Sequence, residues 1–168
     1  RQRLHNEMSL FDEWFLPRLL GYCLNDDEQK LLQSVYRQLE DAALQQPQVW
    51  VHRDYHSRNL IYRDGKAPGV IDFQDAVRGP ITYDLVSLLR DCYLRWPPEQ
   101  VRGWALTYGD MARECDLLPD VTPEEFLRWF DWMGLQRHIK VLGIFSRLYL
   151  RDGKAGYLQD IPLVIRYT

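Results

Sequence analysis

Three side chains that carry oxygen ligands, Asp54, Asn59 and Asp72, lie in a stretch whose neighbouring residues are largely apolar. A carboxylate or carboxamide is costly to bury unless another group compensates it, so each of these side chains needs a partner. Carboxylate and amide oxygens are ligands for Mg²⁺, which usually completes its coordination shell with water molecules and the phosphates of a substrate. If folding brings the three side chains together, they form a site suited to magnesium-dependent phosphate chemistry.

The spacing of these residues matches the catalytic loop of kinases. Residues 52–59 fit the pattern H-R-D-x-x-x-x-N, and Asp72 opens a D-F dipeptide where a kinase has D-F-G. Asp54 matches the residue that accepts the proton of the attacking hydroxyl, whereas Asn59 and Asp72 match the metal ligands. The alternative is a chance tripeptide at the end of a strand, but the joint match of all these positions is more specific than His52 to Asp54 alone.

Short strands are expected to position these residues. Runs of β-branched and aromatic residues predict the strands 49–52, 60–62 and 70–71. The loop 53–58 would then be held by strands at both ends. Asp64 and Gly65 favour a turn, so the second and third strands should form a hairpin. This hairpin is expected to return Asp72 towards the other two proposed ligands.

The residues around this loop have structural as well as functional interpretations. His52 is expected to be a structural histidine, because Asp54 already fills the role of base. Asp84 either interacts with the N-terminus of its own helix or accepts backbone N–H groups from the catalytic loop, so we expect support from it rather than chemistry. His56 and Arg58 lie inside the loop, where contacts to phosphate or substrate compete with simple solvent exposure.

Two further pairs of polar residues are candidates for substrate contacts. Gln74 and Asp75 follow the proposed metal ligand and could contact the metal or the hydroxyls of the acceptor, although a turn-forming pair would look the same. Arg137 and His138 lie on a long helix whose other face is apolar, and a solvated face is the simpler interpretation of each residue alone. They nevertheless belong to an unusually polar cluster, 134–138, within a hydrophobic helix.

Bulk properties indicate one compact domain and argue against some partners. The 168 residues are 46% hydrophobic and include six Trp and ten Tyr, which is ample for a core. The net charge of −3 gives no basic face for nucleic acid, and no apolar run is long enough to span a membrane. The chain starts with neither Met nor a hydrophobic signal core, so we expect a cytoplasmic protein whose sequence continues upstream.

The cysteines give no sign of a disulfide framework. Cys23, Cys92 and Cys115 are widely separated, odd in number and without C-x-x-C spacing. We expect reduced residues, two or three of them buried, although a bond between two of them is compatible with the sequence.

Helical periodicity covers most of the remaining chain. Apolar residues recur at helical spacing in 2–21, 25–43, 85–96, 98–115 and 122–148. Asn25 and Glu28 predict a capping box at the start of the second helix, and Thr122 followed by Pro predicts the start of the fifth. A break near Gly134 is compatible with the pattern of the fifth helix, and 157–167 is expected to be a short helix or coil. The prediction is a mainly α-helical fold with a small β-hairpin unit.

With these motifs in place, the sequence resembles the aminoglycoside phosphotransferase and choline kinase-like superfamily, whose fold is related to that of protein kinases. The resemblance is carried by residues 52–59, by Ile71-Asp72-Phe73 and by Tyr83-Asp84-Leu85. More narrowly, three segments look like the bacterial anomeric kinases that phosphorylate N-acetylmuramate and N-acetylglucosamine at C1 in cell-wall recycling: 70–76, 136–145 and 151–154.

The resemblance covers nearly all of the chain but only part of such an enzyme. The chain has no G-x-G-x-x-G loop, and none of its lysines lies in a strand pattern such as V-A-I-K. The resemblance therefore implies that residues 1–168 form the C-terminal lobe of a protein kinase-like α+β fold. In this lobe the catalytic loop would be 52–59 and the metal-binding motif 71–75. An N-terminal nucleotide lobe of the same protein would be its partner.

The activity implied by the resemblance is transfer of the γ-phosphoryl group of ATP, with Mg²⁺, to a hydroxyl of a small molecule. An acidic amino sugar predicts a cationic pocket, to which Arg137 or His138 would contribute, and the sequence leans towards this acceptor. An aminoglycoside, choline or another small alcohol remains an alternative within the same superfamily. A kinase-like interaction module without catalysis is an alternative of another class, although the intact base and metal ligands argue against it.

Overall fold

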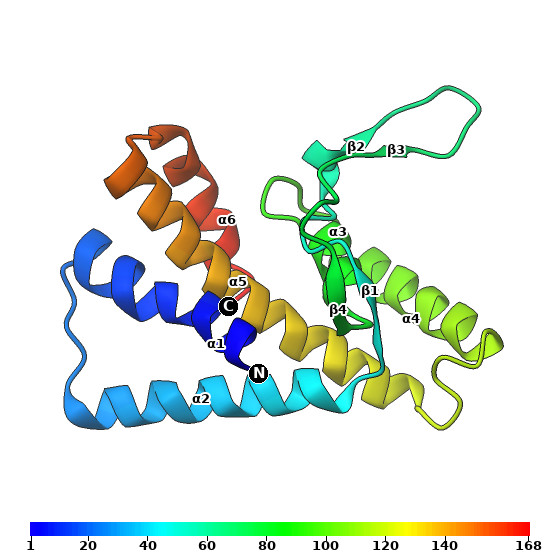
Figure 1. Ribbon diagram of the computed structural model, residues 1–168, viewed down its shortest axis with the longest axis horizontal. Helices are drawn as coiled ribbons and strands as arrows, with labels where there is room; N and C mark the ends of the chain where they lie inside the picture. The colour runs from blue at the N-terminus through cyan, green and yellow to red at the C-terminus, as the bar shows by residue number, and fades with distance from the viewer.

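The computed structural model describes residues 1–168 and is organised around one long helix, α5 (Pro123–Asp152) (Figure 1). Thr122 caps its start by accepting a hydrogen bond from the backbone N–H of Glu125, at 3.2 Å. Gly153 ends it in the left-handed conformation, with φ +69°. The helix is continuous, so the break considered near Gly134 is absent. Helices from every other part of the chain pack against α5.

The N-terminal segment forms one continuous rod that is made of two kinds of helix. The α-helix α1 (Gln2–Leu10) continues into the π-helix η1 (Phe11–Leu19), where a single helix over 2–21 was expected. Pro17 lies inside η1 and has no backbone N–H, so the regular α-helical hydrogen bonds cannot continue through it. The rod crosses α5 so closely that a Cβ on Gly143 would lie 2.4 Å from the backbone carbonyl carbon of Leu10. Only glycine fits at this crossing.

Helix α2 (Asp26–Gln45) begins as predicted. The side chain of Asn25 accepts the backbone N–H groups of Asp27 and Glu28, both at 3.0 Å, and Glu28 returns a bond to the backbone N–H of Asn25 at 2.9 Å. The capping box is therefore confirmed. The helix lies below the N-terminal rod in Figure 1 and leads into the first strand.

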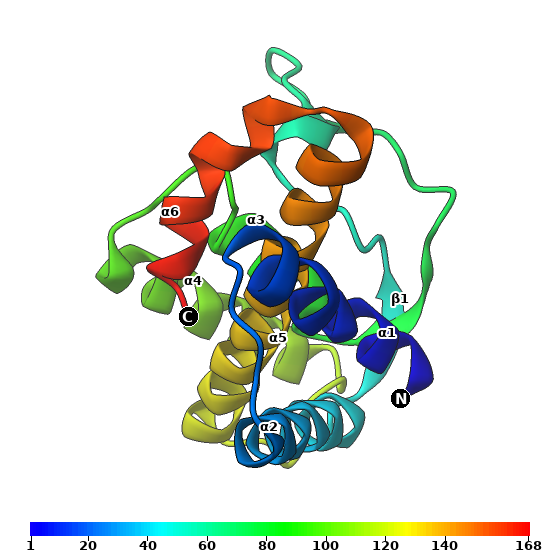
Figure 2. The same ribbon diagram turned by 90° about the vertical axis from the view of Figure 1, so that its left-hand side faces the viewer.

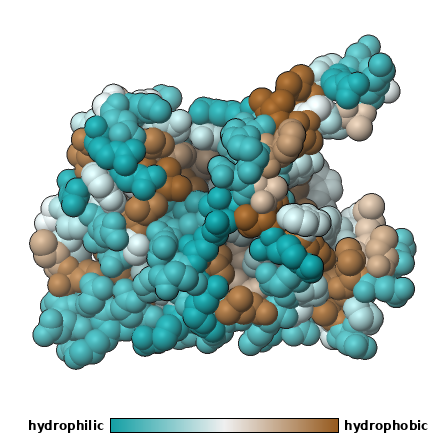
Figure 3. Space-filling model, viewed as in Figure 1, coloured by the Kyte–Doolittle hydropathy of each residue, from teal (hydrophilic) through white to brown (hydrophobic).

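The strands form two small antiparallel pairs that hold the catalytic loop between them. Strand β1 (Gln48–Val51) pairs with β4 (Val77–Pro80), and β2 (Leu60–Ile61) pairs with β3 (Gly69–Val70). All three predicted strands are present, although each ends one residue early, and β1 and β3 also begin one residue early. The predicted hairpin turn is present too, with Gly65 at φ +62°. The β2–β3 hairpin projects from the body of the molecule, and hydrophobic surface is exposed at its base (Figures 1 and 3).

The helix after the hairpin is shorter than expected. Helix α3 (Tyr83–Leu89) stops well before 96, and the chain turns until α4 (Pro98–Glu114). At this stop, the side chain of Asp91 accepts the backbone N–H of Tyr93 at 3.0 Å, a local bond that competes with further helix formation. The C-terminal tail forms the 3₁₀-helix η3 (Ala155–Asp160) and helix α6 (Ile161–Ile165).

The predictions of the fold class and of the burial of the cysteines can both be compared with the structure. The fold is mainly helical with a small β unit, as predicted. Only Cys92 is buried, whereas Cys23 and Cys115 are exposed, so the expectation of two or three buried cysteines was wrong. All three are free thiols. None of the helices combines the length and the apolar character needed to cross a bilayer.

Candidate active site

The catalytic loop is anchored at its start by Asp84, in the first turn of α3. One carboxylate oxygen of Asp84 accepts the backbone N–H of His52 at 2.6 Å, and the other accepts that of Arg53 at 2.9 Å. Arg53 has a φ of +78°, a left-handed conformation that is unfavourable for a residue with a side chain. The two charge-assisted bonds help to hold this conformation, so the loop-supporting contacts considered for Asp84 are present.

A second carboxylate, Asp91, holds the same loop further along. It is almost fully buried and accepts the backbone N–H of Ser57 at 2.9 Å. The sequence analysis did not select this residue. No local pattern marks it, because Asp91 lies two residues beyond the last residue of α3, where the helical spacing from Asp84 no longer applies. Asp84 and Asp91 therefore hold the loop from the two ends of α3.

The loop and the strand beyond the hairpin are joined by hydrogen bonds. The side-chain amide of Asn59 donates to the backbone carbonyl of Asp54 at 2.9 Å. The backbone N–H of Ile71 donates to the carbonyl of Asn59 at 3.2 Å, and a ring nitrogen of His52 lies 2.9 Å from the carbonyl of Ile71. These bonds bring the segment that carries Asp72 against the loop that carries Asp54 and Asn59. His52 therefore contacts the segment that carries Asp72, which is compatible with the structural role predicted for it.

The side chains at this junction fit a divalent cation. The amide nitrogen of Asn59 is used by the loop, which leaves its carbonyl oxygen as a ligand. Asp72 is exposed, has a φ of +68°, and accepts a bond from Gln74 on one carboxylate oxygen at 2.7 Å. Asp75 is exposed beside them and has no side-chain hydrogen bond. No three His, Cys, Asp or Glu side chains gather into a protein-only metal cage. The donors present are hard oxygens, which suit Mg²⁺ with water and phosphate completing its shell.

His56 and Arg58 both lie against Tyr93, in the turn after α3. The ring of His56 meets that of Tyr93 edge to face, with centroids 5.5 Å apart, and its Nδ1 is buried without a partner. Burial, followed by the charge of Arg137, lowers the pKa of His56, so this ring is neutral at pH 7. The guanidinium carbon of Arg58 lies 3.5 Å from the centre of the Tyr93 ring, and its side chain is exposed.

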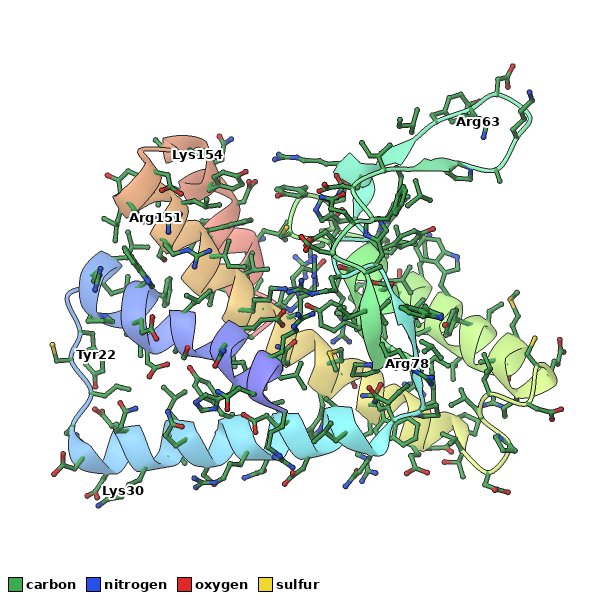
Figure 4. All side chains as sticks on the ribbon, in the orientation of Figure 1. Tyr22, Lys30, Arg63, Arg78, Arg151 and Lys154 are labelled. Atoms are coloured by element: carbon green, nitrogen blue, oxygen red, sulfur yellow. The ribbon has the colours of Figure 1, made fainter.

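A cavity of ≈ 300 Å³ opens beside Arg58, at the lower end of the usual size range of small-molecule sites. Its lining comes from the catalytic loop and from the segment around η3: Arg58, Lys154, Gly156, Tyr157, Gln159 and Asp160. Lys154 stands at the end of α5, and Arg63 stands on the hairpin across from it (Figure 4). Two of the lining residues, Arg58 and Lys154, are cationic, and one, Asp160, is a carboxylate.

A buried cluster of charged residues supports the catalytic loop, and the sequence analysis did not predict it. Glu7 of α1 forms ion pairs with Arg53 at 2.7 Å and with Lys140 of α5 at 3.2 Å. It also accepts bonds from Tyr83 and from the side chain of Gln136, both at 3.3 Å. Glu7 lies on a helix that was predicted from the spacing of its apolar residues, and no pattern indicated that Glu7 itself is buried. The cluster ties the N-terminal rod to the residue that precedes Asp54.

Arg137 and His138 are both buried, so the solvated helix face considered for them was wrong. Arg137 donates to the backbone carbonyl of Arg53 at 3.3 Å and thus supports the loop. His138 instead lies 3.1 Å from the carbonyl of Arg90 and stacks on Tyr167 with ring centroids 4.7 Å apart. Burial lowers the pKa of His138 to about 4, which keeps the ring neutral. Its contacts are those of a packing residue.

Comparison with known proteins identifies the family. Residues 3–118 match the model of the phosphotransferase enzyme family. The N-acetylmuramate/N-acetylglucosamine kinase of Neisseria meningitidis serogroup B is 47% identical over 167 residues, which cover 99% of this chain and 50% of that protein. The enzymes of the same name from Pseudomonas putida and Pseudomonas aeruginosa are 45% and 43% identical, and the match covers 98% of this chain and 48% of each.

A solved structure shows the same fold. It is an aminoglycoside phosphotransferase with bound ADP, which superposes with a TM-score of 0.55 at 18% identity over 99% of this chain and 52% of that one. The chain spans about half the length of the curated relatives it matches. By its family match, its curated relatives and its fold, the chain belongs to the phosphotransferase enzyme family.

Proposed function

We propose that this chain is the C-terminal lobe of a small-molecule kinase that transfers the γ-phosphoryl group of ATP to the anomeric hydroxyl of N-acetylmuramate or N-acetylglucosamine. The observation that carries the proposal is the loop 52–59, whose backbone is fixed by Asp84 and Asp91 and joined to the segment that bears Asp72. The identity of 43–47% to kinases named for these two sugars supports the choice of acceptor.

Each residue at the junction has one role in the proposed reaction. Asp54 orients the attacking hydroxyl and accepts its proton, which an anomeric hydroxyl releases more readily than an ordinary alcohol. Asn59 and Asp72 would hold Mg²⁺, whose chemistry is to neutralise the phosphate charge during transfer. Gln74 positions Asp72 through their hydrogen bond. The rigid anchoring of the loop matters because phosphoryl transfer depends mainly on positioning and charge stabilisation.

The nucleotide contacts of the proposed kinase come from an N-terminal lobe of the same protein. Supporting this, Tyr62 in the hairpin is 84% exposed and Phe73, three residues after β3, is 66% exposed. A second lobe and a nucleotide base would cover this apolar area. The relatives are about twice as long as this chain, which leaves room for such a lobe.

The cavity beside Arg58 is the proposed acceptor site. Arg58 and Lys154 favour an anionic ligand, and N-acetylmuramate carries a lactyl carboxylate that N-acetylglucosamine lacks. An aminoglycoside is polycationic and would need clustered carboxylates, whereas Asp160 is the only carboxylate in this lining. The charge of the cavity therefore favours the acidic amino sugar over the antibiotic.

The test is a kinase assay on the full-length protein with ATP-Mg²⁺ and N-acetylmuramate, N-acetylglucosamine, choline and an aminoglycoside. Asp54→Asn should lower kcat about 10²–10⁴-fold while the KM of the acceptor changes little, because the base is lost but the cavity remains. Asp120→Asn is the matched control, because Asp120 is exposed and outside the site. Near-normal turnover in Asp54→Asn would remove the base from this role. Failure to phosphorylate any acceptor would favour the alternative of a non-catalytic interaction module.

A further inference from the structure

A second cavity lies away from the catalytic loop, where the turn after α3 meets α4, α5 and α6. Its volume is ≈ 400 Å³, within the size range of small-molecule sites. Figure 2 shows the C-terminus just beyond α6. We call it the arginine cavity, after four of its lining residues: Arg90, Arg95, Arg102 and Arg166. None of its lining residues lies in the catalytic loop or the metal-binding motif.

The charge of the arginine cavity is strongly unbalanced. Asp131 is the only carboxylate in its lining, and it pairs with Arg90. Arg95, Arg102 and Arg166 have no carboxylate within ion-pair distance. The chain as a whole carries a net charge of −3, so this concentration of positive charge is local to the cavity. Such a concentration attracts an anion and raises its local concentration.

The walls of the cavity suit the rest of an organic ligand. Trp96, Phe130 and Tyr167 contribute aromatic surface, and the guanidinium of Arg90 already stacks over Phe130 at 4.6 Å. The hydroxyl of Tyr167 is buried without a hydrogen-bond partner. An unmade hydrogen bond of a buried group is costly, and a ligand oxygen reaching this hydroxyl would satisfy it.

We infer that the arginine cavity is a second binding site, separate from the catalytic site, for a small organic phosphate. Phosphate fits better than a carboxylate because it offers three oxygens to several guanidinium groups, which bind it through paired hydrogen bonds. The aromatic walls would hold the sugar or nucleoside that carries the phosphate. Since Arg90 directly precedes Asp91, the site also adjoins the carboxylate that holds the catalytic loop.

The experiment is isothermal titration calorimetry on the full-length protein at low ionic strength, without ATP, with glucose 1-phosphate, uridine 5′-monophosphate and inorganic phosphate as separate probes. At least one organic phosphate should bind about tenfold or more tightly than inorganic phosphate. The double variant Arg95→Gln/Arg166→Gln should weaken that binding by about tenfold or more. Arg37→Gln, which removes one exposed and unpaired arginine from α2, should leave it unchanged.

Kinase activity of the double variant should stay near wild type, which shows that it is folded. Whichever organic probe binds more tightly identifies the source of the phosphate, and either answer supports the inference. Binding that survives Arg95→Gln/Arg166→Gln would place the probe elsewhere, for example in the catalytic site, and would overturn the inference. Equal affinity for inorganic and organic phosphate, or no binding of any probe, would overturn it as well.

Discussion

Replacing Glu7 with Gln tests whether the buried charge cluster supports the fold. Glu7 is the only carboxylate within ion-pair distance of Arg53 and Lys140, so the change leaves two cations without a counter-charge. Lys140 is only 6% exposed and cannot regain water. Breaking a buried ion pair in this way costs about 3–5 kcal/mol. Because domains unfold at a cost of about 5–15 kcal/mol, Glu7→Gln should remove a large share of the stability.

A second variant separates lost charge pairing from lost packing. Lys140→Met keeps a long side chain and removes the most buried cation, so Glu7→Gln/Lys140→Met leaves only Arg53, whose side chain is 21% exposed. The double variant should be more stable than Glu7→Gln alone by about 1 kcal/mol or more. Glu125→Gln is the matched control, because it breaks an exposed pair with Arg128, at 3.5 Å, and should cost less than about 1 kcal/mol.

The assay is urea unfolding at several pH values. Burial by itself would raise the pKa of Glu7, but the nearby charges of Lys140 and Arg53 outweigh it and hold the pKa below its ordinary value. A carboxyl group whose pKa is lowered by folding stabilises the protein at neutral pH, and this stability is lost as the pH falls through the folded value. The wild type should therefore lose stability in acid more steeply than Glu7→Gln, from about pH 4.3 downwards. A cost below about 1 kcal/mol at pH 7, or a double variant whose loss is the sum of the single losses, would refute the coupling.

Other substitutions test the loop, the acceptor cavity and the helix crossing. Asp84→Ala and Asp91→Ala should each lower kcat/KM by about tenfold or more with native circular dichroism, since each removes charge-assisted bonds worth about 1.5–3 kcal/mol; unchanged kinetics would show that the loop keeps its shape without them. Arg58→Gln should lower kcat/KM more for N-acetylmuramate than for N-acetylglucosamine in the kinase assay, and equal losses would contradict a carboxylate contact. Gly143→Ala would bring a Cβ to 2.4 Å from Leu10, so thermal unfolding should show a loss of about 1–3 kcal/mol, and a wild-type melting temperature would mean that the crossing is not tight.

Local patterns predicted the part of the site that is built from neighbouring residues. The strands around the loop, the hairpin turn at Gly65 and the capping box at Asn25 depend on short-range rules of conformation and hydrogen bonding, and all of them are present. The bonds of Asp84 to the loop were one of two roles considered for this residue, and they join positions 32 and 31 residues apart, which no short-range rule covers.

The parts that sequence analysis missed depend on tertiary contacts. Glu7 and Arg53 are 46 residues apart, and nothing local marks Glu7 as buried. Arg137 and His138 were assigned a solvated face because α5 shows one apolar stripe, yet packing of helices all around α5 buries its polar residues as well. The early end of α3 depends on the side chain of Asp91, whose bond to a backbone amide outweighs the apolar periodicity beyond it.

Helix α3 spans most of the distance between the two carboxylates that hold the catalytic loop, since Asp84 lies in its first turn and Asp91 lies two residues beyond its last residue. Inserting or deleting one residue within α3 would turn the segment that carries Asp91 by about 100° around the helix axis and move it by about 1.5 Å along it. The second anchor would then point away from Ser57. The length of this short helix should therefore tolerate far less variation than its sequence, and the spacing of the two acidic residues offers a simple criterion for recognising an intact catalytic lobe.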